Sequence, residues 1–375
     1  SYYRIISLTH FQINQKPYFY LPYYKMKRRR NIILLFLGLA NAALLLIAIM
    51  ASYLNPVSFP LPAFISLFFP VLWLFNLILF VVALFINKKL SLIPLMLIIA
   101  SLYQLSLVFT FSFDADVDSK ANDIELISYN TGNADTVDLG LSQKRVFNGD
   151  FFKEADIICL QEFVPSHVNG KVILESYPYK VNVDYYGKVY SDSSGLSILS
   201  NYSFIEYGWF KQQDEDTYAL WGKVLVENDT IILINVQLQS IRLEDDELDA
   251  MTTLGGIQQL PTKLSIIYSK IKRGYNWREE QVRILSNFIK SSNHPVILCG
   301  DFNDPPSSYT YSLLSDELND GFLKKGNGLG TTYAGKLPFL RLDYIMVTND
   351  FKVVYYDKSG VSFSDHYPLK VMLEP

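Results

Sequence analysis

Hydrophobic residues follow two different patterns along the chain. In the first third they form long stretches separated by loops whose only charged residues are Lys88 and Lys89, and the three stretches lie at about residues 31–53, 61–86 and 91–112. About 20 apolar residues suffice for a helix to cross the hydrocarbon core of a bilayer. The pattern therefore predicts three transmembrane α-helices.

After residue 122, short apolar runs alternate with turn residues, which is typical of β-strands. Nine runs are predicted as strands, at residues 124–130, 155–161, 195–200, 218–227, 230–238, 295–301, 342–347, 351–357 and 369–374. A helix is predicted before the run at 295–301, because Asn276 can cap it and Val282 and Leu285 would share an apolar face. Many strands with interspersed helices favour an α/β sandwich around paired sheets.

The two patterns divide the chain into four parts. We predict an N-terminal extension and basic flank at 1–30, three transmembrane helices at 31–113, an acidic linker at 114–122 and one folded domain at 123–375. The first methionine is Met26, directly before a basic run, so we expect translation to start there.

Charge is distributed unevenly between these parts. Residues 1–120 carry 10 Lys and Arg and three Asp and Glu, a net charge of +7. The whole chain has 33 Lys and Arg and 37 Asp and Glu, so residues 121–375 carry 23 basic and 34 acidic residues, a net charge of −11. Basic residues precede the first apolar stretch and occupy the second loop, and the positive-inside rule places both in the cytoplasm. Three crossings of the cell (inner) membrane then leave the folded domain extracytoplasmic.

The two cysteines, Cys159 and Cys299, lie inside apolar runs. Two cysteines form no disulfide framework, and these show no metal-ligand spacing. Buried free thiols are therefore expected, with a disulfide between neighbouring strands as the alternative.

Polar residues that could take part in catalysis follow the apolar run in "VILCGDFNDPP". Asp301 and Asn303 are two positions apart, so their side chains point the same way in an extended chain. One such pair is often a turn. Comparable residues stand at the ends or starts of other strands, namely Asn130, Glu162, Asp343, Asp365 and His366. Because α/β proteins place their sites at strand ends, this recurrence indicates one site.

The residue types in these positions suit phosphoester chemistry. Carboxylates and amides are hard oxygen ligands, which favour Mg²⁺ or Mn²⁺ over zinc. A histidine beside an aspartate can be kept cationic and bind phosphate. The sequence has no Walker-type glycine-rich loop, no serine-nucleophile motif and no Cys/His cluster. Metal-assisted attack of water on phosphorus is the reaction class that these residues favour.

The motifs "ISYN", "LQE", "GLSILSNY", "ILCGDFND", "RLDYIMV" and "SDHYPL" occur in the order found in the endonuclease/exonuclease/phosphatase superfamily, which this chain resembles over residues 123–375. That superfamily includes deoxyribonuclease I, abasic-site endonucleases, neutral sphingomyelinases and inositol polyphosphate 5-phosphatases. The resemblance implies a four-layered sandwich of two β-sheets flanked by helices, with the site at one edge.

The resemblance also implies a metal site and its ligands. Glu162 corresponds to the principal ligand of a Mg²⁺ or Mn²⁺ ion, with Asn130 and Asp365 close to the metal.

The remaining motif residues correspond to the catalytic positions of the superfamily. Asp301 would activate or orient the attacking water, and Asn303 would hold a phosphate oxygen. His366 would contact the scissile phosphate and stabilise its transition-state charge, with Asp343 as its orienting partner. The implied reaction is in-line hydrolysis.

One position departs from the pattern of many relatives. "INVQLQS" places Gln237 where they carry histidine, and glutamine can donate a hydrogen bond but cannot act as an acid. A catalytically degenerate binding domain on the same scaffold is therefore an alternative to a membrane-anchored, metal-dependent phosphoester hydrolase.

The net negative charge of residues 121–375 affects which class of substrate is favoured. A protein that grips DNA needs basic surface to displace counterions, and no basic stripe is evident in the sequence. A smaller or membrane-borne phosphoester is favoured over DNA, with lipid headgroup, nucleotide and nucleic acid open as substrates and an extracytoplasmic nuclease as the enzymatic alternative. The bilayer is the predicted partner of the helices, and no protein partner is indicated.

Overall fold

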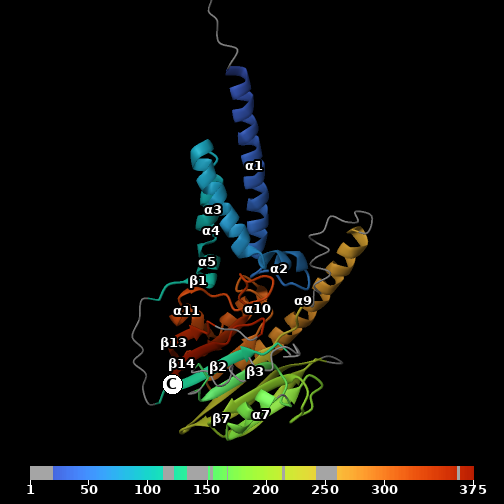
Figure 1. Cartoon of the computed structure of the whole chain (residues 1–375), viewed down its shortest axis with the longest axis vertical. Coiled ribbons are helices and arrows are strands. Elements are labelled where there is room, and N and C mark those ends of the chain that lie inside the picture. Colours follow the sequence, from blue (N-terminus) through green and yellow to red (C-terminus); the bar gives the residue numbers. More distant parts are fainter. Residues whose placement is uncertain are drawn as a thin grey trace, which may run out of the picture.

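The computed structural model describes residues 20–112, 122–132, 151–152, 155–166, 168–212, 216–241, 260–360 and 364–375. A column of apolar helices stands on an α/β part that contains all the large sheets (Figure 1). Residues 1–19 of the predicted extension, and all of the predicted linker except Asn122, lie outside the described residues.

The chain passes along the helical column three times (Figure 1). The first pass leads toward the α/β part, the second away from it and the third back to it. The helices of the column and its base are α1 Tyr20–Met50, α2 Pro60–Ser66, α3 Phe69–Ile86, α4 Leu92–Ala100 and α5 Leu102–Val108.

Two described helices are long and apolar enough to span a membrane, Met26–Met50 and Phe69–Ile86. The prediction of three such helices is therefore met only in part. The third predicted stretch is divided at Ser101 into α4 and α5, and the Ser101 hydroxyl donates to the Leu97 carbonyl oxygen at 2.6 Å, a kind of bond that often accompanies a bend. The second stretch is likewise divided, into α2 and α3.

Buried asparagines connect the helices of the column. The Asn41 side chain on α1 donates to the Asn76 side-chain oxygen on α3 at 3.4 Å, and Asn76 donates to the Pro94 carbonyl oxygen on α4 at 2.9 Å. Hydrogen bonds of this kind hold helices together where lipid gives no hydrophobic driving force between them.

Two six-stranded sheets form the α/β part. One has the order β10-β12-β9-β8-β7-β6 and the other the order β13-β14-β2-β3-β5-β4. The strands are β2 Ile124–Asn130, β3 Ile157–Phe163, β4 Tyr179–Asp184, β5 Gly195–Ser200, β6 Phe204–Lys211, β7 Thr217–Val226, β8 Asp229–Gln237, β9 Val296–Asp301, β10 Asn319–Asp320, β12 Asp343–Val347, β13 Lys352–Lys358 and β14 Leu369–Glu374. A short ribbon pairs β1 Phe109–Thr110 with β11 Gly328–Leu329.

Helices cover the outer faces of the two sheets, which gives four layers. The remaining helices are α7 Val168–Glu175, α9 Leu260–Lys290, α10 Tyr309–Ser315 and α11 Gly321–Lys325. One apolar cluster fills the space between the sheets, a second lies between the first sheet and α9 and α10, and a third lies between the second sheet and α7. The predicted α/β sandwich of two sheets flanked by helices is confirmed.

Each sheet contains a parallel pair, β8 with β9 in the first and β2 with β3 in the second, whereas the other described pairings are antiparallel. The carboxyl ends of both parallel pairs carry the polar residues predicted as a site. The two parallel pairs, one in each sheet, therefore bring the ends of four strands to one edge of the sandwich.

All nine predicted strands are present within two residues of their predicted bounds. Sequence patterns missed β4 and β6, and they placed the start of the long helix too late. Asn276 is not a cap but lies within α9, which begins at Leu260. Cys159 and Cys299 are buried free thiols, as expected.

Candidate active site

The carboxyl end of β9 positions Asp301 between two other predicted site residues. Asp301 is the register partner of Asp343 on β12 and of Gln237 on β8, so the three residues form a row across adjacent strands. Gly300 makes this pairing feasible, because its φ is +130° and a Cβ there would lie 2.0 Å from the Val236 carbonyl oxygen. A larger residue would therefore separate β9 from β8.

Asn303 folds back onto Asp301 in a turn, rather than continuing the extended chain that the spacing argument assumed. Its backbone N–H donates to one carboxylate oxygen of Asp301 at 2.8 Å, and its side-chain amide donates to the other at 3.2 Å. The same amide also donates to the Leu238 carbonyl oxygen at 2.8 Å. Asn303 has a φ of +51°, a left-handed conformation that asparagine tolerates better than most residues.

The second sheet contributes Asn130 and Glu162 to the same place. The Asn130 amide donates to Asp301 Oδ2 at 3.1 Å and to Glu162 Oε1 at 3.4 Å, so Asn130 links the ends of the two sheets. Glu162 lies in a β-bulge, where the pairing of β3 with β5 shifts between Leu160 and Phe163, and its φ is +50°. Bulges re-aim side chains next to active sites, and this one directs Glu162 toward Asn130.

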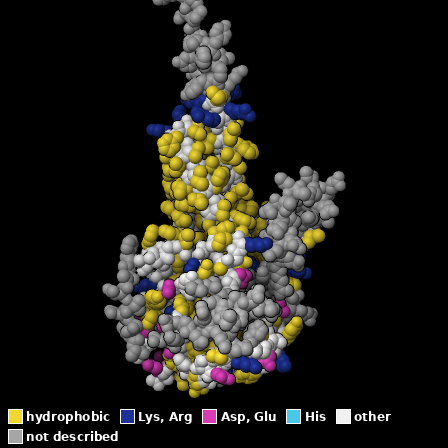
Figure 2. All heavy atoms as spheres, in the orientation of Figure 1, with side chains coloured by type: hydrophobic (Ala, Val, Ile, Leu, Met, Phe, Trp, Pro, Cys, Tyr) yellow, Lys and Arg dark blue, Asp and Glu magenta, His cyan; other side chains and the backbone are white. Residues whose placement is uncertain are grey.

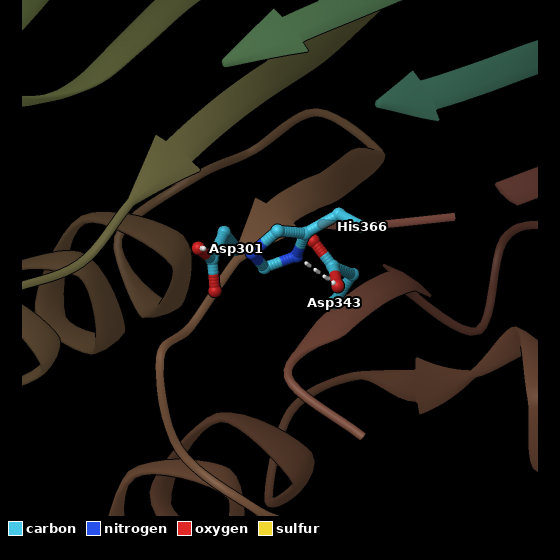
Figure 3. Close-up of side chains that lie close together, drawn as sticks. All are labelled: Asp301, Asp343 and His366. Atoms are coloured by element: carbon cyan, nitrogen blue, oxygen red, sulfur yellow. Dashed lines mark hydrogen bonds and ion pairs between the residues drawn. The ribbon is translucent and has the colours of Figure 1, made fainter. Parts of the chain in front are cut away.

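His366 lies between the carboxylates of Asp343 and Asp301 (Figure 3). Its Nδ1 is 2.8 Å from Asp343 Oδ2, and its Nε2 is 3.9 Å from Asp301 Oδ2. Thr332 is fully buried and accepts the Asp343 backbone N–H at 3.0 Å. The ring of Tyr333 packs edge-on against the imidazole, with centroids 5.2 Å apart.

The site is electrostatically unusual because these groups are buried together. Burial raises the pKa of Asp301 to about 7, and the Asp343 charge adds to this, although His366 opposes it. Burial opposes the charged form of His366, but the carboxylates of Asp343 and Asp301 outweigh burial and raise its pKa to about 10. The imidazole is therefore a cation at neutral pH, beside a carboxyl group that titrates near neutrality.

Gln237 connects the metal-ligand candidate Glu162 to a tyrosine that sequence reasoning missed. The Tyr185 hydroxyl donates to the Gln237 side-chain oxygen, and the Gln237 amide donates to Glu162 Oε1. Tyr185 follows β4, a strand that the sequence pattern did not reveal. The glutamine in the position of the relatives' histidine is thus held on both sides and fixes a carboxylate.

Two sets of side chains could hold a metal ion. Asp301, Asp343 and His366 place ligand atoms within 4.8 Å of one another, with His366 Nδ1 bonded to Asp343 and Nε2 3.9 Å from Asp301 Oδ2. Glu162 and Asn130 instead offer oxygen atoms, which suit Mg²⁺ or Mn²⁺. Asp365 is exposed, and its carboxylate lies beside the turn after Asn130, 3.1 Å from where a Cβ on Gly132 would be.

An open cavity of about 620 Å³ adjoins the site at Glu162, Gln237 and Asn303. It is lined by Glu162, Tyr185, Tyr186, Ser193, Ser194, Asp216, Thr217, Tyr218, Gln237, Leu238, Gln239, Ser240, Gln281 and Asn303. The described lining contains no lysine or arginine. The cavity is therefore polar and aromatic, with acidic groups at Glu162 and Asp216.

A buried ion pair outside the predicted site residues supports the cavity wall. Arg278 on α9 lies 2.9 Å from the Asp304 carboxylate and donates to the Gln239 carbonyl oxygen at 2.6 and 2.9 Å. Asp304 directly follows Asn303 in the sequence, so the pair joins the loop after β9 to the segment after β8. No local sequence pattern indicates that Arg278 is buried.

Sequence and structure comparisons extend these observations. The sequence model of the endonuclease/exonuclease/phosphatase family matches residues 127–366, and that of a domain of unknown function matches residues 30–108. No curated protein matches the chain.

Several solved structures are similar to this chain at low sequence identity. An endonuclease/exonuclease/phosphatase from Bacteroides vulgatus is 16% identical with a TM-score of 0.50, covering 67% of this chain and 98% of that one. A humanized TDP2 of D. rerio is 15% identical with a TM-score of 0.49, covering 68% and 100%. Beta toxin from Staphylococcus aureus is 20% identical with a TM-score of 0.46, covering 66% and 99%. The similarity to the Bacteroides vulgatus structure shows the fold alone. Because the family model covers more than half of the sequence, the chain belongs to the endonuclease/exonuclease/phosphatase family.

Proposed function

We propose that this protein is a membrane-anchored, divalent-metal-dependent phosphoester hydrolase that acts outside the cytoplasm. The observation that carries the proposal is the convergence of Asp301, the His366–Asp343 pair and the Asn130–Glu162 pair at one edge of two sheets. A general base, a cation for phosphate and oxygen ligands for a metal are the groups that hydrolysis of a phosphoester requires.

The metal would be held by Glu162 and Asn130, with Asp365 nearby. These residues fit a hard cation because they offer carboxylate and amide oxygens and no sulfur. When bound, Mg²⁺ or Mn²⁺ would supply positive charge for the phosphate oxygens. Gln237 would keep the Glu162 carboxylate oriented toward it.

The reaction itself assigns distinct roles to the remaining residues. Asp301, with a pKa of about 7, would accept a proton from the attacking water as the new oxygen–phosphorus bond forms and the bond to the leaving group breaks. The His366 cation, held by Asp343, would stabilise charge on the phosphate oxygens. Asn303 holds Asp301 in place, and we propose that its amide also contacts a phosphate oxygen in the complex.

The membrane orientation follows from the helical column. α1, α3 and the α4–α5 pair pass along it three times, so the column has a far end and an end at the α/β part (Figure 1). Lysine and arginine side chains gather at the far end, where the first turns of α1 carry Lys27 and Arg28 close to Asn87, next to Lys88 and Lys89, and apolar side chains cover the sides (Figure 2). The positive-inside rule supports a cytoplasmic far end and an extracytoplasmic α/β part.

Hydrolysis of bis-p-nitrophenyl phosphate by the full chain in detergent tests the proposed activity. We expect turnover that needs Mg²⁺ or Mn²⁺, stops with chelator and is lost in Asp301→Ala but retained in Asp316→Ala, where the aspartate is exposed. Absence of turnover together with absence of Mg²⁺ and Mn²⁺ binding by calorimetry would favour the degenerate binding domain instead.

A further inference from the structure

The helical column packs directly on the loop that follows the Asp301 strand. α1 ends at Met50, and the hydroxyl of Ser52 donates to the Ser307 carbonyl oxygen at 2.9 Å. The Ser307 hydroxyl in turn donates to the Ser66 carbonyl oxygen at the end of α2, at 3.2 Å. Two residues span at most about 7 Å. The loop after Asn303 is therefore hydrogen-bonded to a residue that lies within that distance of the end of α1.

Helix α2 also supports a wall of the cavity. Ala63 is buried against Ile271 and Tyr275 of α9, and Ile241 packs on this cluster. Ile241 directly follows Ser240, which lines the cavity. Leu67, at the end of α2, packs against Leu340 and Leu342 in the segment that leads into Asp343.

A second attachment fixes the orientation of the α/β part. Arg341 donates to the Leu107 carbonyl oxygen on α5 at 3.2 Å, and the Gly330 N–H donates to the Val108 carbonyl oxygen at 2.9 Å. The pairing of β1 with β11 continues this contact. Because the column is attached at two separate places, the α/β part is held in one orientation relative to the bilayer.

The base of the column is ringed by exposed apolar side chains. Tyr53, Val57, Phe59, Leu61, Phe111 and Leu329 are all exposed. Aromatic and apolar residues of this kind are typical of the interface between membrane and water. The 25 residues of Met26–Met50 would extend about 37 Å, enough to cross a core of about 30 Å. The membrane surface then lies at the level of these side chains.

The cavity chemistry favours one class of phosphoester at this surface. Tyr185, Tyr186, Tyr218 and Asp216 offer aromatic and acidic groups, and the described lining has no cation to bind a chain of phosphates. A single phosphodiester with a neutral or cationic substituent fits such a lining better than a polyanionic strand.

Building on the proposed hydrolase function, we infer that the substrate is a phosphoester lipid of the same bilayer that anchors the chain. The column holds the site at the membrane surface, and the ring of apolar residues seats the α/β part on the leaflet. A lipid headgroup reaches the cavity by lateral diffusion, whereas a soluble substrate gains nothing from this placement.

Reconstituted vesicles test the inference. The full chain is placed in vesicles of deuterated phosphatidylethanolamine and phosphatidylglycerol, mixed with protein-free vesicles of the unlabelled lipids and bis-p-nitrophenyl phosphate, with Mg²⁺ or Mn²⁺. Mass spectrometry follows loss of each lipid. We expect deuterated lipid to be hydrolysed at least about tenfold faster than unlabelled lipid, because sharing a membrane raises the effective concentration.

The outcomes separate this inference from the proposed function. Turnover of bis-p-nitrophenyl phosphate with no loss of lipid, or with equal loss from both vesicle populations, would overturn the lipid inference and leave the hydrolase intact. No turnover of any of the three substrates would overturn both.

A surface variant tests the role of the apolar ring without touching the catalytic groups. Phe59→Ser with Leu61→Ser changes side chains that are 53% and 57% exposed, and Ile205→Ser changes a 58% exposed side chain on β6. We expect the first pair to slow hydrolysis of lipid in the same vesicle about threefold or more, because less apolar area is buried in the leaflet. Turnover of bis-p-nitrophenyl phosphate should not change. An equal effect of Ile205→Ser on lipid hydrolysis would contradict the inference.

Discussion

His366 and Asp343 are joined by a contact of 2.8 Å between the imidazole Nδ1 and a carboxylate oxygen, and both side chains are buried. Asp343 begins the strand next to Asp301, so the sheet holds the carboxylate that orients the histidine. Because Asp343 holds Nδ1, the opposite edge of the ring, which carries Nε2, lies toward Asp301. A cationic imidazole held rigidly in this way is suited to a phosphate group.

Replacing the orienting carboxylate should slow catalysis with little change in the fold. We expect Asp343→Asn to lower kcat for bis-p-nitrophenyl phosphate about 100-fold or more, because His366 loses the charge that keeps it cationic and in place. The measurement is steady-state kinetics of the full chain in detergent. Asp316→Asn, on an exposed aspartate, is the matched control, and equal rates for the two variants would contradict the role of Asp343.

The pH dependence of stability in the presence of chelator follows from the same pair. The pKa of His366 is raised from 6.5 to about 10 in the folded protein, so the folded state holds a proton that the unfolded state releases. The stabilisation is complete below about pH 6.5 and is lost as the pH rises to about 10. Asp301, with a pKa raised from 3.8 to about 7, makes stability fall with rising pH over its own range.

Thermal unfolding at several pH values measures this effect. We expect the melting temperature of the chelator-treated protein to fall between pH 6.5 and pH 10, and to fall less in His366→Gln, which lacks the titrating group. Parallel curves for the two proteins would show that His366 does not titrate with a raised pKa.

Tyr185 offers a test of how the metal-ligand candidate is oriented. Its hydroxyl donates to Gln237, which donates to Glu162, so Tyr185→Phe should loosen the carboxylate without removing it. We expect the Mg²⁺ concentration for half-maximal activity to rise about tenfold. The neighbouring Tyr186, which is 81% exposed, provides the control variant Tyr186→Phe. A fall in kcat with no change in metal dependence would argue against an orienting role.

Sequence patterns predicted most of the fold because its central strands are buried on both faces. β2, β5 and β14 match their apolar runs residue for residue. β6 was missed because it is an edge strand with mostly exposed side chains and therefore has no buried run to recognise. The early start of α9 was missed because its first turns include exposed apolar residues, such as Ile266 and Tyr268, which give no amphipathic pattern.

The candidate site likewise contains a local contact that the sequence indicates and longer-range contacts that it does not. The contact of Asp301 with Asn303 is local and belongs to a turn of the kind that Asp and Asn near Gly and Pro often form. The link between Tyr185 and Gln237 depends on how the turn after β4 meets the end of β8 in the other sheet, which no local pattern records. Division of the third apolar stretch at Ser101 was not predicted, because hydropathy does not distinguish one long helix from two shorter ones.

The buried ion pair between Arg278 and Asp304 should be important for stability and for the cavity wall together. Both side chains are at most 2% exposed, so Arg278→Met would leave the Asp304 carboxylate buried without its partner and the Gln239 carbonyl oxygen without two donors. We expect destabilisation of about 3–5 kcal/mol, measured as a lower melting temperature in detergent. Arg283→Met, on an exposed position one turn further along α9, should change stability by less than about 0.5 kcal/mol. If the two variants melt alike, Arg278 contributes no more than a surface cation. If Arg278→Met melts early while its residual activity per folded molecule is unchanged, the pair stabilises the fold but does not shape the cavity wall.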